Sequence, residues 1–239
     1  MNSDEYLIKS WSAFKEYLKY KPDAIMGIRC RKSLQQSVRD LVEEKNLKLS
    51  FFEIMQGNSV DISASFEFAV KLKVCVEFEF LERVARRVDS GRDLILALDH
   101  LTDSRNLGAI ARSAGFFGVS DMVIPTRRQV TLNSASVATA QGGFSLVSLT
   151  EVVNLSRTLE TLKKYGYWVI GTDMDGEDVA LIRGAYSKTV LVLGSEDKGI
   201  SAKVKKNCDR IIGIKGGKPG LESLNVSVAC GIFLNELAR

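Results

Sequence analysis

The stretch "DLILALDHLTDSRNLGAIARSAGFFGVSDMVIP" (93–125) decides the fold class. Its first seven residues form a short apolar run of the kind found in buried strands, and residues 106–118 carry small and apolar side chains at helical spacing. A second apolar run of strand type follows at 121–125. Strands that are apolar throughout and alternate with helices predict an open parallel sheet covered by helices on both faces.

The same alternation continues to the end of the chain. Further strands are predicted at 167–173, 189–196 and 210–214, and further helices at 134–143 and 154–166. From Leu224 onward, apolar residues again fall at helical spacing, which predicts a buried closing helix. We therefore expect one α/β domain over residues 93–239.

Residues 1–80 have a different pattern. A helix, a break at Pro22 and a short strand are followed by a second helix and a second strand, which predicts a small α/β unit. The charged stretch 81–92, with a Ser-Gly pair near its end, is expected to be a linker between the two domains.

Composition excludes several classes of protein. The chain has 239 residues, 45% of them hydrophobic, and a formal net charge of +4, which is too mild to indicate nucleic-acid binding by itself. No apolar run reaches the roughly 18 residues of a membrane span, and the acidic, polar N-terminus is unlike a signal peptide. The four cysteines lack C-x-x-C spacing, so we expect neither a zinc site nor a disulfide framework. We expect a cytoplasmic protein with reduced thiols.

Ligands of open parallel sheets bind beyond the carboxyl ends of the strands, which directs attention to the loops there. In the first such loop, Asn106 is placed to cap a helix, and Arg112 follows six residues later. Arginine is permanently charged and offers five donors in a planar fork, so it suits an anionic ligand. The alternative is an ordinary surface arginine.

Two more loops carry candidate residues. The strand before 195 ends at Gly194, where a ligand could approach the backbone closely, and Glu196 could cap a helix or pair with an arginine. A plain strand-to-helix turn is the alternative. In the last loop, glycines and a proline precede Ser223 and Asn225, which either cap the closing helix or face a ligand.

Other chemistries lack their motifs. Neither G-x-x-x-x-G-K-[ST] nor G-x-G-x-x-G is present, which disfavours nucleotide hydrolysis and a nicotinamide-dependent dehydrogenase. The single histidine, His100, has no nucleophile elbow to serve, and one histidine with dispersed cysteines makes a catalytic zinc site improbable. We expect His100 to be a loop residue.

The three loops resemble the motifs of a known family. "NLGAIARSAGFFGV" (106–119), "LVLGSEDKGIS" (191–201) and "SLNVSVACGI" (223–232) are similar, in the same order, to the three motifs of the SpoU (TrmH-type) branch of the SPOUT superfamily of RNA 2′-O-methyltransferases. The resemblance covers residues 93–239 well and the N-terminal unit loosely. It implies a C-terminal deep trefoil knot, S-adenosylmethionine as methyl donor without a metal, an RNA partner, and a homodimer to which the closing helix contributes.

The resemblance also implies roles for single residues. By motif position, the catalytic set is Asn106, Arg112, Glu196, Ser223 and Asn225. The cofactor would be held by Thr172, Leu193, Gly194, Ile214 and Leu224, largely through backbone groups. The chain departs from the family pattern in "IKGGKPG" (214–220), one residue longer than the usual loop, and in Ser104, where proline is common.

The target depends on the flanks of the methyltransferase domain. A small N-terminal α/β unit resembles the RNA-binding domain of the family's ribosomal RNA members, closest to those that methylate guanosine. Large-subunit ribosomal RNA is therefore the favoured substrate. The alternatives are tRNA, an enzyme that protects ribosomal RNA from an antibiotic, and a non-catalytic RNA-binding or assembly protein that keeps the fold.

Overall fold

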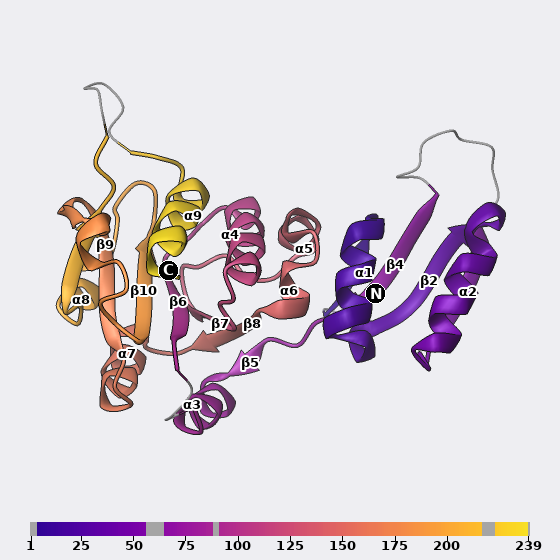
Figure 1. Ribbon diagram of the computed structural model, residues 1–239, viewed down its shortest axis with the longest axis horizontal. Coiled ribbons are helices and arrows are strands. Elements are labelled where there is room, and N and C mark those ends of the chain that lie inside the picture. The colour runs from indigo at the N-terminus through magenta and orange to yellow at the C-terminus, as the bar shows by residue number, and fades with distance from the viewer. Residues whose placement is uncertain (1–3, 56–64, 88–90, 217–222, 239) are drawn as a thin grey trace.

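The computed structural model describes residues 4–55, 65–87, 91–216 and 223–238, and these form a larger and a smaller unit side by side (Figure 1). The larger unit is built on a sheet whose seven described strands are all parallel. In spatial order the strands are β11 (Arg210–Gly213), β9 (Trp168–Asp178), β10 (Lys188–Gly194), β6 (Asp93–Asp99), β7 (Asp121–Pro125), β8 (Ser148–Val152) and β5 (Cys75–Val76). The predicted parallel α/β sheet is confirmed.

Helices cover both faces of this sheet (Figure 1). Leu96 and Leu98 of β6 point into one core, and Ile95 and Ala97 point into the other, since successive side chains of a strand alternate between faces. One face is covered by α4 (Ser104–Phe116), α5 (Ser134–Ala140), α6 (Gly143–Leu146) and α9 (Val226–Leu237). The other is covered by α3 (Glu77–Ala85), α7 (Leu155–Lys164) and α8 (Ala202–Lys205). This two-sided burial explains why the strands are apolar throughout.

The predicted helix 134–143 is shorter in the structure. Helix α5 ends at Ala140, where Gln141 and Gly142 adopt left-handed backbone conformations with φ of 46° and 98°. Gly143 then lies so close to α4 that a Cβ there would be 2.7 Å from the carbonyl carbon of Ala111. The chain turns here into α6 and into β8, a strand that the sequence analysis does not predict.

The smaller unit holds a four-stranded sheet in the order β1-β4-β2-β3. Its elements are β1 (Glu5–Ile8), α1 (Trp11–Tyr20), β2 (Ile25–Arg31), α2 (Gln35–Glu44), β3 (Phe51–Met55) and β4 (Phe66–Lys71). Aromatic rings of α1 and β4 form its core, with Phe14 and Phe66 centroids 5.0 Å apart. The unit packs against α5 and α6, where the Ser10 hydroxyl donates to Gln141 Oε1 at 2.8 Å.

The predicted boundary at residue 80 and the predicted linker 81–92 differ from the structure. Residue 80 lies inside α3, and β5, which precedes this helix, pairs with β8 of the large sheet. Phe80 and Val84 of α3 are completely buried against the core of the larger unit. The stretch reads as a linker because α3 is rich in charge and buries only these two apolar side chains. Residues 88–90 lie outside the described residues.

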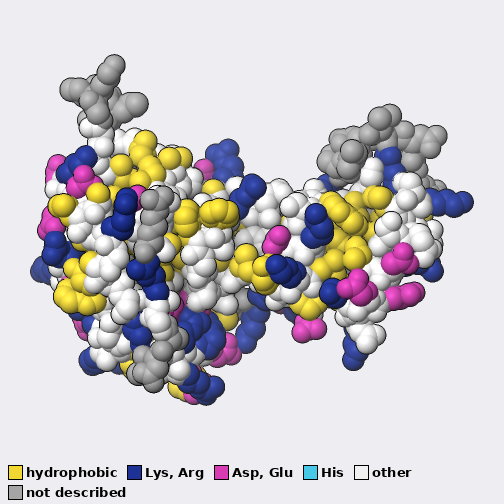
Figure 2. Space-filling view, in the orientation of Figure 1, with side chains coloured by type: hydrophobic (Ala, Val, Ile, Leu, Met, Phe, Trp, Pro, Cys, Tyr) yellow, Lys and Arg dark blue, Asp and Glu magenta, His cyan; other side chains and the backbone are white. Residues whose placement is uncertain are grey.

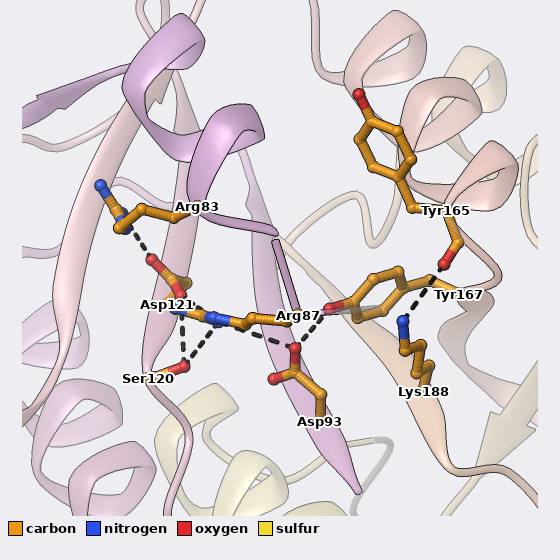
Figure 3. Close-up of polar contacts among 8 residues, drawn as sticks. All are labelled: Arg83, Arg87, Asp93, Ser120, Asp121, Tyr165, Tyr167 and Lys188. Atoms are coloured by element: carbon orange, nitrogen blue, oxygen red, sulfur yellow. Dashed lines mark hydrogen bonds and ion pairs between the residues drawn. The ribbon is translucent and has the colours of Figure 1, made fainter. Parts of the chain in front are cut away.

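Charged side chains lock α3 to the amino ends of the strands (Figure 3). Arg83 and Arg87 both lie 2.7 Å from the carboxylate of Asp121, which is completely buried. Arg87 also reaches Asp93 at 3.6 Å, and the hydroxyl of Tyr167 donates to Asp93. Burial, and then the bond to Asp93, raises the pKa of Tyr167 far above its ordinary range, so the phenol stays a donor. We call these five residues the amino-edge network.

Among the described residues, no helix combines the length and the hydropathy that crossing a membrane requires.

Candidate active site

Helix α4 begins earlier than the sequence suggests, and this changes the role of Asn106. The N-cap is Asp103, whose carboxylate accepts a hydrogen bond from the backbone N–H of Arg105 at 2.8 Å. The expectation that Asn106 caps the helix is therefore wrong, because the helix starts at Ser104 and Asn106 lies within its first turn. From there the Asn106 side-chain amide donates to Glu196 Oε1.

Asn225 links the closing helix to this pair. It is the N-cap of α9, and its Oδ1 accepts from the backbone N–H of Ser227 at 2.9 Å. Its Nδ2 donates to Asn106 Oδ1 at 3.1 Å. Asn225, Asn106 and Glu196 thus form a continuous hydrogen-bonded group, which we call the amide–carboxylate chain. For Asn225, the capping role is confirmed, and the same side chain also bonds Asn106. Its role toward a ligand stays a prediction.

Ser223 and Leu224 do not join the amide–carboxylate chain. Helix α9 begins at Val226, so Ser223 lies two residues before the cap and is exposed, with no hydrogen bond to a described residue. The expectation that Ser223 caps the closing helix is wrong, since Asn225 fills that position. The Leu224 side chain is 48% exposed, and the apolar spacing that starts at this residue precedes the helix itself.

Arg112 is exposed to solvent and is not part of the amide–carboxylate chain. It lies on α4 six residues after Asn106, which on a regular helix is about 120° around and about 9 Å along the axis. Its side chain is exposed and makes no ion pair or hydrogen bond with any residue that the structure describes. The structure therefore brings three of the five predicted catalytic residues together and leaves Arg112 available for an external anion.

Gly194 ends β10, and the backbone itself needs its lack of a side chain. A Cβ at this position would lie 2.1 Å from the carbonyl carbon of Gly199 and 2.3 Å from the backbone nitrogen of Ile200. Ser195 and Gly199 exchange two backbone hydrogen bonds, which closes a tight turn that carries Glu196. The space that a side chain of residue 194 would occupy is thus filled by the returning chain.

Asp99 anchors this turn, and the sequence analysis misses it. Its carboxylate is buried and accepts from the backbone N–H of Ser201 at 2.7 Å, while the other oxygen lies 2.6 Å from His100 Nδ1. His100 is a loop residue, as expected, and adopts a left-handed backbone with φ of 65°. The one available signal was a charged residue at the end of an apolar strand.

The predicted cofactor residues lie at the same ends of the strands. The Thr172 hydroxyl donates to the Val192 carbonyl at 3.1 Å, and Leu193 is buried in the core, so their side chains serve the fold. Ile214 follows β11 and Leu224 precedes α9, and their backbone groups form no hydrogen bond with the described backbone. Open, neutral backbone donors and acceptors suit an adenosine held through the main chain. Part of the unusual loop, 217–222, lies outside the described residues.

A surface depression of about 500 Å³ lies elsewhere, between β9, β11 and α8. It contains none of the ten predicted site residues. Lys205 Nζ lies 2.5 Å from Asp173 in its wall, and that bond lowers the pKa of Asp173. We therefore place the candidate site at the amide–carboxylate chain. The described residues contain no cluster of histidine, cysteine or carboxylate side chains that could hold a metal ion.

The chain is similar to known proteins. The model of the SpoU rRNA methylase family matches residues 93–235. An uncharacterized tRNA/rRNA methyltransferase of Archaeoglobus fulgidus is 36% identical over 202 residues, which cover 82% of this chain and 88% of the relative. The chain belongs to the SpoU methylase family. A relative of Mycolicibacterium smegmatis is 40% identical over 153 residues, and this chain spans about half of the length of such mycobacterial relatives (48%).

Solved structures of SpoU methyltransferases have the same fold. AviRb of Streptomyces viridochromogenes matches 99% of this chain and 89% of its own, with a TM-score of 0.77 and 18% identity. It has also been solved in complex with S-adenosylmethionine. The TrmH/SpoU tRNA-modifying enzyme of A. aeolicus matches 68% of this chain and 82% of its own, with a TM-score of 0.55 and 26% identity. The SpoU protein described here is an RNA methyltransferase that uses S-adenosylmethionine.

Proposed function

We propose that this SpoU enzyme methylates the 2′-hydroxyl of a ribose in RNA. The observation that carries the proposal is the amide–carboxylate chain, because it joins one polar residue from each of the three motifs in a single hydrogen-bonded group. A structural neighbour described as an RNA 2′-O ribose methyltransferase, which matches 98% of this chain with a TM-score of 0.68 and 16% identity, supports the ribose as target.

The reaction requires alignment more than activation. S-adenosylmethionine supplies an electrophilic methyl group, and a ribose hydroxyl is a weak nucleophile that must be brought into line with it. Holding two reactants in line supplies roughly 7–11 kcal/mol of the barrier reduction. The protein therefore has two tasks. It must fix the ribose hydroxyl, and it must bind the negatively charged phosphate of the target nucleotide.

The amide–carboxylate chain performs the first task in this proposal. Asn225 is fixed by its capping bond to Ser227, and it orients the amide of Asn106. Asn106 in turn donates to Glu196, so the carboxylate is held in one orientation at the carboxyl end of β10. From there Glu196 accepts a hydrogen bond from the ribose hydroxyl and directs its oxygen toward the methyl group.

Arg112 performs the second task. Its guanidinium binds a phosphate of the target nucleotide and polarises the hydroxyl. A guanidinium stays protonated in proteins and is therefore a reluctant base. The hydroxyl proton would pass to phosphate or water while the O–C bond formed and the bond between the methyl carbon and the sulfur of the donor broke.

The cofactor is proposed to lie against the backbone of Gly194, Ile214 and Leu224, beside Thr172 and Leu193. The open backbone groups of Ile214 and Leu224 support this placement. The trefoil knot implied by the family resemblance would enclose these loops, and the packing of α9 against α4 and β10 is in keeping with it.

Ribosomal RNA, with guanosine in the large subunit favoured, is the proposed substrate. The support comes from the smaller unit. An rRNA methyltransferase of Sinorhizobium meliloti matches 98% of this chain, including that unit, with a TM-score of 0.74 and 18% identity. The tRNA-modifying enzyme of A. aeolicus matches 68% of this chain. tRNA is the second candidate, since the Archaeoglobus relative carries both substrates in its name.

A homodimer that is closed by α9 is also proposed. Val228 on α9 is 52% exposed, and the adjoining 3₁₀ turn Val179–Ile182 leaves Leu181 73% exposed. Apolar side chains exposed together mark surfaces that another chain covers. We also propose a cytoplasmic enzyme, because the spacing of the four cysteines in the sequence is not that of a disulfide framework.

The test uses tritiated S-adenosylmethionine and separate pools of unmodified ribosomal RNA and tRNA. Label that enters one pool, at a single site resistant to alkaline cleavage, would support 2′-O-methylation and identify the substrate class. Arg112→Ala is the control and should lose the label. Absence of label in both pools, together with no cofactor binding by calorimetry, would refute the proposal and favour a non-catalytic RNA-binding protein.

A further inference from the structure

A second pair of arginines lies near the candidate site, in the loop between β7 and α5. Arg127 and Arg128 follow the carboxyl end of β7, and both side chains are exposed. Neither makes an ion pair or hydrogen bond with a residue that the structure describes. Arg128 adopts a left-handed backbone with φ of 55°, which is uncommon for a residue with a long side chain. We call residues 126–132 the arginine loop.

Hydrogen bonds hold the arginine loop against the catalytic side of the molecule. The backbone N–H of Val130 donates to the Leu101 carbonyl at 2.7 Å. In return, the Leu101 backbone N–H donates to Gln129 Oε1 at 2.6 Å. Leu101 lies between the end of β6 and the start of α4, so the loop is fixed beside the segment that carries Asn106.

The other end of the arginine loop contacts the smaller unit. The hydroxyl of Tyr6, in β1, donates to the Leu132 carbonyl at 3.4 Å. A second bond, from Ser10 to Gln141, fixes α1 to the end of α5, the helix that follows the loop. The loop therefore lies between the smaller unit and the candidate site. Figure 2 shows Lys and Arg side chains (dark blue) on the upper edge of the larger unit, where it meets the smaller one.

The lack of carboxylate partners distinguishes this pair from most arginines of the larger unit. Of the eleven arginines described in this unit, six make ion pairs, namely Arg83, Arg86, Arg87, Arg105, Arg183 and Arg210. Arg127 and Arg128 stand next to each other without such a partner on the described chain, although like charges at this spacing repel. An anion with charges at regular intervals would relieve that repulsion, and a nucleic-acid backbone is such an anion.

We propose that Arg127 and Arg128 bind backbone phosphates of the RNA strand that runs from the target nucleotide toward the smaller unit. The proposal rests on the proposed function. Arg112 would hold the phosphate at the reaction site, and the arginine loop would hold phosphates farther along the strand. Such contacts position an RNA without reading its sequence. Their loss weakens binding and leaves the chemical step intact.

The experiment measures RNA affinity of the full chain as a function of salt. The probe is an unmodified ribosomal RNA transcript cut into fragments of about 50 nucleotides, bound on filters at several salt concentrations. The double variant Arg127→Gln/Arg128→Gln should bind about 10- to 30-fold more weakly, and the slope of log K against log salt should fall by about 1.4, or 0.7 per phosphate on a single strand. Cofactor affinity should stay unchanged.

A matched control uses Arg92 and Arg157, which are also exposed and without a carboxylate partner among the described residues. Arg92 precedes β6 at the opposite edge, and Arg157 lies on α7. Arg92→Gln/Arg157→Gln should change RNA affinity less than twofold. Equal losses in both double variants, or an unchanged salt slope in the arginine-loop variant, would overturn the proposal.

Two further measurements separate this proposal from the activity. Arg127→Lys/Arg128→Lys should restore most of the affinity, because lysine also contacts phosphate as a point charge. The same preparations are assayed for methyl transfer. If the wild-type protein methylates neither RNA pool but the affinity difference persists, the activity proposal fails and the phosphate contacts stand. If methylation occurs and the difference is absent, only the phosphate contacts fail.

Discussion

The two edges of the large sheet use arginine in opposite ways. At the amino edge, Arg83 and Arg87 converge on the buried carboxylate of Asp121 and are neutralised there (Figure 3). At the carboxyl edge, Arg127 and Arg128 are exposed, as is Arg112 on α4, and none of the three has a carboxylate partner on the described chain. The arginines of the first edge serve the fold, and those of the second remain available to an external anion.

The difference follows from desolvation. An ion taken out of water must be paired, because a buried charge without a partner costs several kcal/mol. The amino-edge network meets this requirement and ties α3 to the sheet. An exposed guanidinium has no such requirement, so leaving it unpaired costs little and keeps its five donors for phosphate. Lack of a partner, together with a position near the candidate site, therefore distinguishes the candidate substrate contacts from the structural arginines.

Removing the charge at the carboxyl edge should have the largest effect on activity. Arg112→Ala is expected to lower the rate of methyl transfer by about 10²- to 10³-fold, as the loss of a preorganised donor does in other enzymes. Because the side chain is exposed, the unfolding free energy should change by less than about 0.5 kcal/mol. Single-turnover methylation and urea denaturation measure both. A rate within a few-fold of the wild type would refute a catalytic role for Arg112.

Removing the charge at the amino edge should affect stability instead. Asp121→Ala leaves Arg83 and Arg87 facing each other, so the unfolding free energy should fall by about 3 kcal/mol. Glu79→Gln on the same helix breaks an exposed pair with Lys73 and should cost less than about 1 kcal/mol. Urea denaturation compares the two. Similar losses of unfolding free energy in the two variants would show that the buried amino-edge network stabilises the fold no more than the exposed pair does.

Gly194→Ala tests the turn that carries Glu196. The added Cβ would clash with the backbone at Gly199, which has no flexible side chain to move aside. We expect a loss of about 2–3 kcal/mol in stability, as overpacked sites show, and a weaker affinity for S-adenosylmethionine by calorimetry. A variant that is fully stable but binds no cofactor would instead show that the glycine serves the ligand alone.

Asn225→Ala and Ser223→Ala form the smallest and most specific comparison. Loss of the cap of α9 should cost about 1 kcal/mol in Asn225→Ala, and Ser223→Ala should cost almost nothing. Asn225→Ala should also slow methyl transfer about 10-fold, because Asn106 loses a positioning bond at 3.1 Å. Thermal melting and the methylation assay measure the two effects. Equal melting temperatures for the two variants would contradict the assigned cap.

The parallel sheet could be predicted because its strands are apolar on both faces, and β6 shows this in Leu96 and Ala97. Strands β5 and β8 could not be predicted in the same way. The first has two residues, and the second begins after a turn that the contact between Gly143 and α4 requires. Such contacts depend on how segments that are distant in the sequence pack together, and local sequence patterns do not predict this packing.

The candidate site was predictable in its residue types and not in its hydrogen bonds. The motifs named Asn106, Glu196 and Asn225, and the structure joins them in one group. The sequence suggested that Asn106 caps α4, but Asp103 competes successfully because its carboxylate precedes the first helical turn. Asp99 was missed, since its bond to the backbone of Ser201 crosses 102 residues of sequence.

The most direct test of the account is single-turnover methylation of unmodified ribosomal RNA over a range of RNA concentrations. It compares the wild type, Arg112→Ala and Arg127→Gln/Arg128→Gln. The account predicts that Arg112→Ala loses rate even at saturating RNA, and that the arginine-loop variant reaches the wild-type rate at about 10- to 30-fold higher RNA concentration. A full rate for Arg112→Ala at saturating RNA, or a lost maximal rate for the arginine-loop variant, would contradict it.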